Sequence, residues 1–140
     1  MAELNSTTMV GGETIFEGYE LPEYRHRVTR MSIAWMAVAL EDPNEIHVED
    51  TVASEAGFDT VIAHGTFPVG MIGTMITNWI GPGRVKYLSI RLEAPTFPGN
   101  EIVAGARISE IANQELRLEI WAQSGGKRVA SGECALIWEQ

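Results

Sequence analysis

The residues best suited to chemistry lie in one short segment, Glu41-Asp42-Pro43-Asn44-Glu45-Ile46-His47. Pro43 cannot continue a helix, so it releases the chain into a loop in which Asp42 and His47 can reach one small molecule. Imidazole titrates near neutral pH and a carboxylate fixes its tautomer, so such a pair around a water can take and return protons. Asp-Pro-Asn is equally a common turn, and an isolated histidine is commonly structural, so a plain turn remains an alternative interpretation.

A second chemical feature is Gly65, which we place at the N-terminus of the most apolar helix of the chain. Its N–H is then one of the unpaired donors at the positive end of the helix dipole. Because glycine has no side chain, a carbonyl oxygen can approach closely, and a developing oxyanion there would be stabilised. His64, the preceding residue, either contacts the substrate or caps the helix, and the sequence leaves both interpretations open.

Helices with apolar faces must position these residues. Thr29 is a suitable N-cap for a helix that ends near Glu41, with apolar residues at helical spacing: Ile33, Met36, Ala37 and Leu40. A short second helix is expected over residues 51–56. The segment from Gly65 to Ile80 has almost no polar face, so we expect protein all around it, with Gly70 and Gly73 admitting another backbone.

After Gly81 the hydrophobic period changes from helical to two. Apolar and polar residues alternate over four segments: 87–92, 102–109, 115–122 and 128–138. Short connections, among them Ser124-Gly125-Gly126, imply antiparallel strands. We therefore predict an α+β chain in which an antiparallel sheet wraps around one buried central helix, the hot-dog fold, with other α+β sandwiches as alternatives. The single domain spans residues 18–140 and follows a mostly irregular N-terminal arm, residues 1–17.

Composition excludes several classes of protein. The 140 residues include 10 Lys and Arg against 19 Asp and Glu, and this net charge of -9 argues against a nucleic-acid binder. The one cysteine, Cys134, cannot form an internal disulfide or a thiolate zinc site. No cation precedes Arg25, and no apolar run approaches the roughly 20 residues of a membrane span, so we expect a cytoplasmic protein without membrane contact.

The segment around Asp42 resembles the hydratase motif of the MaoC-like, or type-2, (R)-specific enoyl-CoA hydratases. The motif consists of Asp42-x-Asn44-x-x-His47 followed, eighteen residues after the histidine, by Gly65 in His64-Gly65. Short flanking segments match the family as well: Glu20-Leu21-Pro22, Arg27-Val28-Thr29-Arg30, Ala56-Gly57-Phe58, Leu92-Glu93-Ala94-Pro95 and Pro98-Gly99-Asn100. Family members usually have Gly-Asp-x-Asn-Pro-x-His, whereas Glu41 and Glu45 here replace the glycine and the proline.

The resemblance implies a hot-dog fold and the hydration of a trans-2-enoyl-CoA to a (3R)-hydroxyacyl-CoA, or the reverse dehydration. By position, Asp42 and His47 would hold and activate the water, and Asn44 would orient the water or the pair. The N–H of Gly65 would bind the thioester oxygen. Neither a metal nor a redox cofactor is required, and the coenzyme A thioester is the substrate.

Candidate substrate contacts are His64 and the cations Arg84, Lys86 and Arg91, which suit the phosphates of coenzyme A. The resemblance also implies a homodimer, or a hetero-oligomer with a related hot-dog chain, that protects the sheet edges. Two other functions stay open. One is a non-catalytic or partner-dependent subunit of a heteromeric hydratase. The other is a hot-dog acyl-CoA thioesterase, which the lack of Asp and Glu between Gly65 and Ile80 disfavours.

Overall fold

The structure is a computed structural model that describes residues 9–10 and 12–138. Its elements, in chain order, are β1 (Met9–Val10), β2 (Glu13–Thr14), β3 (Tyr24–Arg27), α1 (Arg30–Ala39), the 3-10 helix η1 (Glu45–His47), α2 (Asp50–Glu55), α3 (Thr66–Ile80), β4 (Val85–Leu92), β5 (Glu101–Ala112), β6 (Glu115–Ser124) and β7 (Lys127–Ile137). The predicted helices and the four predicted strands are confirmed to within a few residues at their ends.

The main sheet is antiparallel, with the strand order β3-β5-β6-β7-β4. A two-residue turn joins β6 to β7, because Ser124 pairs with Lys127. Gly125 and Gly126 take positive φ angles of 59° and 74° in this turn. A type I′ hairpin turn needs positive φ at both central residues, which favours glycine, so the predicted hairpin is confirmed.

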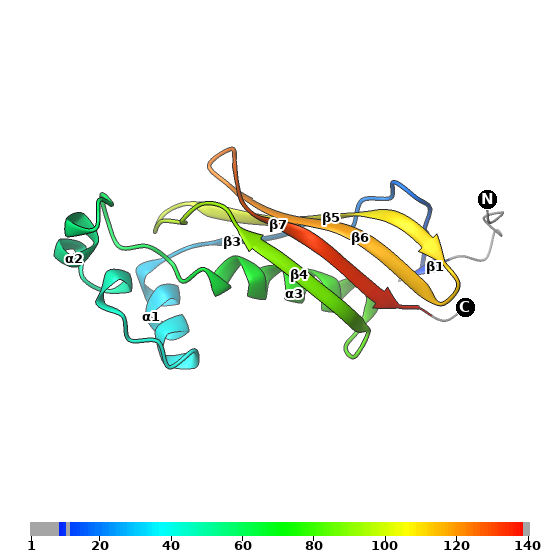
Figure 1. Ribbon diagram of the computed structural model, residues 1–140, viewed down its shortest axis with the longest axis horizontal. Helices are drawn as coiled ribbons and strands as arrows, with labels where there is room; N and C mark the ends of the chain where they lie inside the picture. Colours follow the sequence, from blue (N-terminus) through cyan, green and yellow to red (C-terminus); the bar gives the residue numbers. More distant parts are fainter. Residues whose placement is uncertain (1–8, 11, 139–140) are drawn as a thin grey trace.

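Helix α3 lies in the concave side of this sheet (Figure 1). Its buried residues are Phe67, Pro68, Met71, Ile72, Met75 and Ile76. They share one core with inward-facing strand residues such as Ile102, Ile108, Leu118, Ile120 and Leu136. This is the α+β hot-dog arrangement that the sequence predicts. None of the helices in the described part of the chain is long and apolar enough to cross a membrane.

The expectation that protein surrounds α3 is wrong for the single chain. Thr66, Gly70 and Thr74 are exposed along one side of the helix. A Cβ built on Gly70 or Gly73 would meet nothing within 4 Å, so no backbone comes close to either glycine in the described residues. The physical reason is that one sheet covers only one side of a helix.

Strand β4 forms one edge of the sheet and is less buried than its alternation predicts. Leu88 and Leu92 are 39% and 53% exposed, while Ile90 packs against the core. An edge strand has a neighbour on one side only, so this apolar edge remains open in the single chain.

The N-terminal arm is more ordered than predicted over the residues that the structure describes. The short strands β1 and β2 pair, and Val10 and Ile15 are 7% and 0% exposed within the core. Tyr19 stacks on Trp79 near the end of α3, and its hydroxyl donates to Glu13. That hydrogen bond to a carboxylate raises the pKa of Tyr19. Residues 1–8 and 11 of the expected arm lie outside the described residues.

Candidate active site

The C-terminus of α1 fixes the backbone of Asp42. The N–H of Asp42 donates to the carbonyl of Ala37 at 3.0 Å, and the N–H of Glu41 donates to that of Val38 at 3.2 Å. These two bonds form a Schellman motif, in which the residue after the C-cap takes the left-handed conformation. Glu41 is that residue, with φ at 50°. Glycine adopts this conformation without steric cost, which explains why a glycine would suit the position.

The next turn carries the chain from Asp42 to His47. Oδ1 of Asp42 accepts from the N–H of Asn44 at 3.3 Å, and Oδ1 of Asn44 accepts from the N–H of Ile46 at 3.1 Å. Asn44 is thus the N-cap of η1, and its side-chain oxygen serves the backbone. Glu45 is the first residue of η1, a position that suits proline as well as an acidic residue. Glu45 therefore fits its position in the turn, whereas Glu41 occupies a left-handed conformation that favours glycine.

The carbonyl of Ile62 sets the tautomer of His47. Nδ1 of His47 lies 2.7 Å from this oxygen, which can only accept, so Nδ1 carries the hydrogen. In the neutral ring Nε2 then has a free lone pair. Nε2 lies 3.9 Å from Oδ2 of Asp42, too far for a direct hydrogen bond. One water molecule that donates a hydrogen bond to each of these two atoms fits this separation.

His64 also turns toward Asp42. Its side chain is 1% exposed, and its Nε2 lies 4.0 Å from Oδ2 of Asp42 and 3.3 Å from the carbonyl oxygen of that residue. The ring stacks on that of His47, with centroids 3.7 Å apart and planes 24° from parallel. Among the described residues, Nε2 of His64 has the Asp42 carbonyl as its partner and Nδ1 has none, so the side chain of His64 does not cap α3 and the capping interpretation is wrong.

These three side chains form a compact group that could attract a metal ion. Asp42, His47 and His64 each offer a ligand atom within 4.8 Å of the others. A metal ligand must direct its in-plane lone pair at the ion. Nε2 of His64 faces the carbonyl oxygen of Asp42 at 3.3 Å, which can only accept, so this nitrogen carries its hydrogen there and has no lone pair for a metal. A metal would require His64 to give up this hydrogen bond, whereas a water between His47 and Asp42 would not.

Gly65 is the N-cap of α3, as predicted. Among the hydrogen bonds of the described residues, none is donated by its N–H. A Cβ at Gly65 would lie 2.5 Å from Cδ1 of Leu92, so the side chain of β4 covers the space where a larger residue would reach. The preceding residue is His64, whose side chain lies against Asp42 and His47, so the Gly65 N–H is one residue away from a contact with this pair.

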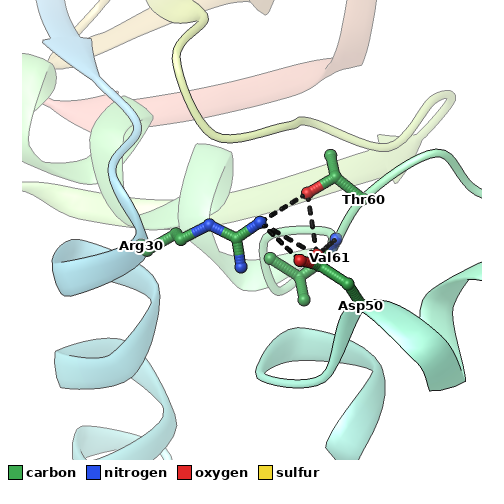
Figure 2. A network of polar contacts seen from close by, with 4 residues as sticks. All are labelled: Arg30, Asp50, Thr60 and Val61. Atoms are coloured by element: carbon green, nitrogen blue, oxygen red, sulfur yellow. Dashed lines mark hydrogen bonds and ion pairs between the residues drawn. The ribbon is translucent and has the colours of Figure 1, made fainter.

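A polar network fixes the helices that precede α3 (Figure 2). Both Oδ1 and Oδ2 of Asp50 lie 2.9 Å from Nη2 of Arg30. Oδ1 also accepts from the hydroxyl of Thr60 at 3.0 Å and from the N–H of Val61 at 3.1 Å. The Arg30 guanidinium and then the Val61 N–H and Thr60 hydroxyl lower the pKa of Asp50. The network joins the starts of α1 and α2 to the segment that carries Ile62 and His64.

The structure does not bring two of the predicted cations to this site. The end of β4 at Leu92 lies beside Gly65, whereas Arg84 and Lys86 lie at or before the opposite end of the strand (Figure 1). Lys86 lies six steps along the strand from Leu92, a separation of roughly 20 Å. Lys86 also faces Glu115 at 3.8 Å. Arg91 is near the site along the strand, but alternation directs it to the face opposite Leu92.

A cation that the sequence analysis missed lies at the same end of the sheet as Gly65. Lys127 lines a hollow of about 320 Å³ together with Phe58, Phe97, Asn100 and others. The carbonyl of Thr96, in the neighbouring segment, accepts from the N–H of Ala63 at 2.8 Å. No local pattern marks Lys127, because a hairpin 60 residues downstream brings it here.

Two other proteins are similar to part of this sequence. The chain is 27% identical over 114 residues to a 3-hydroxybutyryl-CoA dehydratase of Methylorubrum extorquens, covering 78% of this chain and 72% of that protein. It is 47% identical over 51 residues to a UPF0336 protein of Thermobifida fusca, covering 36% of this chain and 33% of that protein. The second match therefore spans only about a third of that relative's length.

Solved structures share the fold. The R-hydratase PhaJ1 of Pseudomonas aeruginosa, in its unliganded form, superposes with a TM-score of 0.81 at 23% identity, covering 91% of this chain and 84% of that one. The ChsH1–ChsH2 complex of Mycobacterium tuberculosis gives a TM-score of 0.81 at 17% identity, covering 89% and 98%. At such identities the likeness establishes the hot-dog fold alone. The family described as MaoC like domain matches residues 17–131, and the chain therefore belongs to the MaoC-like dehydratase family.

Proposed function

We propose that this chain hydrates a trans-2-enoyl-CoA to a (3R)-hydroxyacyl-CoA, or catalyses the reverse dehydration. The observation that carries the proposal is the placement of Nε2 of His47 3.9 Å from Oδ2 of Asp42, with Nδ1 held by Ile62. Both facing atoms are hydrogen-bond acceptors in this tautomer. A water that donates one hydrogen to each leaves its lone pairs free to attack carbon.

The proposed reaction returns every proton. As the water oxygen bonds to C3 of the substrate, one water proton passes to Nε2 of His47, and the electrons of the C2–C3 double bond move toward the thioester oxygen. C2 of the resulting enolate then takes that proton from Nε2. The hydroxyl and the hydrogen have added across the double bond, and the side chains are unchanged. This chemistry uses no metal and no redox cofactor.

The N–H of Gly65 supports the other half of the reaction. Negative charge builds on the thioester oxygen as the enolate forms, and a fixed donor at the N-terminus of a 15-residue helix stabilises it there. Within the described part of the chain this donor has no acceptor, so no hydrogen bond to those residues has to be broken before it meets the substrate. Helix α3 contains no Asp or Glu, which disfavours the alternative thioesterase function.

We also propose that a second copy of the chain covers the open side of α3 and the edge of β4. The exposed apolar residues of this edge are Val85, Tyr87, Leu88 and Leu92. They lie on a strand with free backbone N–H and C=O groups, and a two-fold axis lets one such edge pair with its own copy. Because Leu92 contacts Gly65, the copy would also close the candidate site from this side. The ChsH1–ChsH2 neighbour is a complex of two chains, so a related chain is the competing occupant.

The deciding experiment mixes the purified chain with crotonyl-CoA and with longer trans-2-enoyl-CoAs and follows the absorbance of the conjugated thioester. We expect the absorbance to fall and chiral analysis to give the 3R product. A 3S product would contradict the assignment. Activity that arises only after a second MaoC-like chain is added would instead support the partner-dependent subunit.

A further inference from the structure

The buried imidazole of His64 is not explained by packing alone. Its side chain is 1% exposed, and its Nδ1 is a buried nitrogen without a hydrogen-bond partner in the described structure. A phenylalanine ring would fill similar space without leaving a polar atom unpaired. The reason for a histidine at this position must therefore lie in the contacts of its Nε2 atom and of its ring face.

Direct substrate contact does not account for it either. A side chain that is 1% exposed offers almost no surface to a ligand, whereas Asp42 in the same group is 47% exposed. His64 instead contacts the two groups that the proposed reaction uses. Nε2 lies 3.3 Å from the carbonyl oxygen of Asp42, which can only accept, so Nε2–H donates. The ring face lies on the ring of His47.

The backbone of His64 is fixed to the start of the central helix. Its carbonyl accepts from the N–H of Phe67 at 2.9 Å, within the first turn of α3. One residue thus joins the helix N-terminus, through its backbone, to the Asp42 loop and to the His47 ring, through its side chain.

We infer that His64 is a positioning residue for the proposed hydratase reaction: its Nε2–H holds the Asp42 backbone, and its ring holds the His47 imidazole against rotation. The inference rests on the proposed function. It predicts opposite neutral tautomers for the two stacked rings, with the hydrogen on Nδ1 of His47 and on Nε2 of His64. It also predicts that His64 acts on the rate of reaction more than on substrate binding.

Two substitutions separate the two contacts. His64→Gln keeps an amide donor near the place of Nε2 and removes the ring, while His64→Phe keeps a ring on His47 and removes the donor. We expect kcat to fall about 10- to 100-fold in each, since small misplacements of a catalytic group cost this much, with KM changed less than about twofold. His26→Gln is the matched control, because His26 lies on β3 and makes no hydrogen bond to Asp42, His47 or His64 among the described residues.

Nitrogen-15 NMR of the imidazole rings tests the positioning without any substrate. The chain has three histidines, so the His26→Gln, His47→Gln and His64→Gln spectra assign all of them. The wild type should show the Nδ1–H tautomer for His47 and the Nε2–H tautomer for His64. In His64→Gln the His47 resonances should broaden or shift toward mixed tautomers.

The outcomes are distinct. Unchanged His47 resonances in His64→Gln, or a wild-type kcat in a folded His64→Gln protein, would overturn the positioning role. If His64→Phe fails to fold, His64→Gln alone decides. If the wild type hydrates no enoyl-CoA, the proposed function fails, while the tautomers and their response to His64→Gln still test the contact geometry on their own.

Discussion

Nδ1 of His47 donates to the carbonyl oxygen of Ile62 at 2.7 Å, and this contact leaves Nε2 as the nitrogen that faces Asp42. The acceptor lies on the segment leading to α3, fifteen residues from the histidine. The fold, rather than the local turn, therefore decides which nitrogen can act as a base.

Substitution of either member of the pair should abolish most turnover. We expect His47→Gln and Asp42→Asn each to lower kcat about 100-fold or more, because each removes one of the two groups that hold and deprotonate the water. Steady-state hydration of crotonyl-CoA gives kcat, and circular dichroism checks the fold. Asp59→Asn, on an exposed bend, is the charge-matched control; near-wild-type rates in both site variants would remove the pair from the mechanism.

Gly65→Ala should lower kcat by blocking the approach to its N–H. The φ angle of -57° suits alanine, but its methyl would meet Leu92. We expect a loss of about 10- to 100-fold, less than the 100- to 1000-fold of losing a donor outright. Leu92→Ala in the same chain removes the contact with the methyl. If the double variant regained the rate of Leu92→Ala, displacement of Leu92 would be the cause and the oxyanion role would be unsupported.

Glu41→Gly should stabilise the protein. Glu41 has φ at 50°, which costs a residue with a Cβ about 1–2 kcal/mol. Part of the gain is lost to the larger entropy of glycine in the unfolded chain, so we expect a net increase of about 0.5–1 kcal/mol in the free energy of unfolding. Urea denaturation measures it. Glu41→Ala removes the same charge and keeps the Cβ, so an equal gain in that variant would assign the effect to charge.

Asp50 should make stability depend on pH in a defined direction. Its pKa is lowered in the folded protein, first by Arg30, from about 3.9 in an unfolded chain. A carboxyl group whose pKa is lowered by folding stabilises the protein at pH values above its pKa in the unfolded chain. This contribution is lost as the pH falls through its pKa in the folded protein. Asp50→Asn should therefore melt at a lower temperature than wild type at pH 6, with the difference vanishing at the acid end of the titration. A difference that persists unchanged in acid would point to a non-ionic cause.

Leu88→Asp should produce a monomer if a second copy pairs along β4. A charge at this 39% exposed edge position would be buried against the copy, and burying an unpaired charge is unfavourable. Light scattering should give twice the chain mass for the wild type and the single mass for the variant. Val38→Asp adds the same charge on α1, where Val38 is 70% exposed, and should leave the mass unchanged. A monomeric wild type would contradict the proposed pairing.

The local patterns predicted most of the fold. Alternation in β5, β6 and β7 and the helical spacing after Thr29 each describe one element, and a capping box at Thr29 confirms the start of α1. Exposure of β4 and of one side of α3 could not be predicted, since alternation shows which side is apolar and not whether another chain covers it. Val10 and Ile15 were missed because two-residue strands leave no periodic signal.

The site was only partly predictable for the same reason. Asp42 and His47 share one turn, so their spacing indicates proximity. The Ile62 carbonyl and the contact between Asp50 and Arg30 join residues 15 and 20 positions apart, and no sequence pattern marks them. Charge alone marks Arg84 and Lys86 as candidates in the sequence, and charge does not say at which end of a strand a residue lies.

The Schellman motif after α1 has a consequence for how this chain can vary. Because the backbone of Asp42 is hydrogen-bonded to the last turn of α1, the length of that helix sets the direction of the carboxylate. One residue inserted within the helix would turn everything after it by about 100° around the axis. The position of the carboxylate therefore constrains the number of residues between Thr29 and Asp42, whereas a change of an exposed side chain such as Val38 leaves this backbone register as it is.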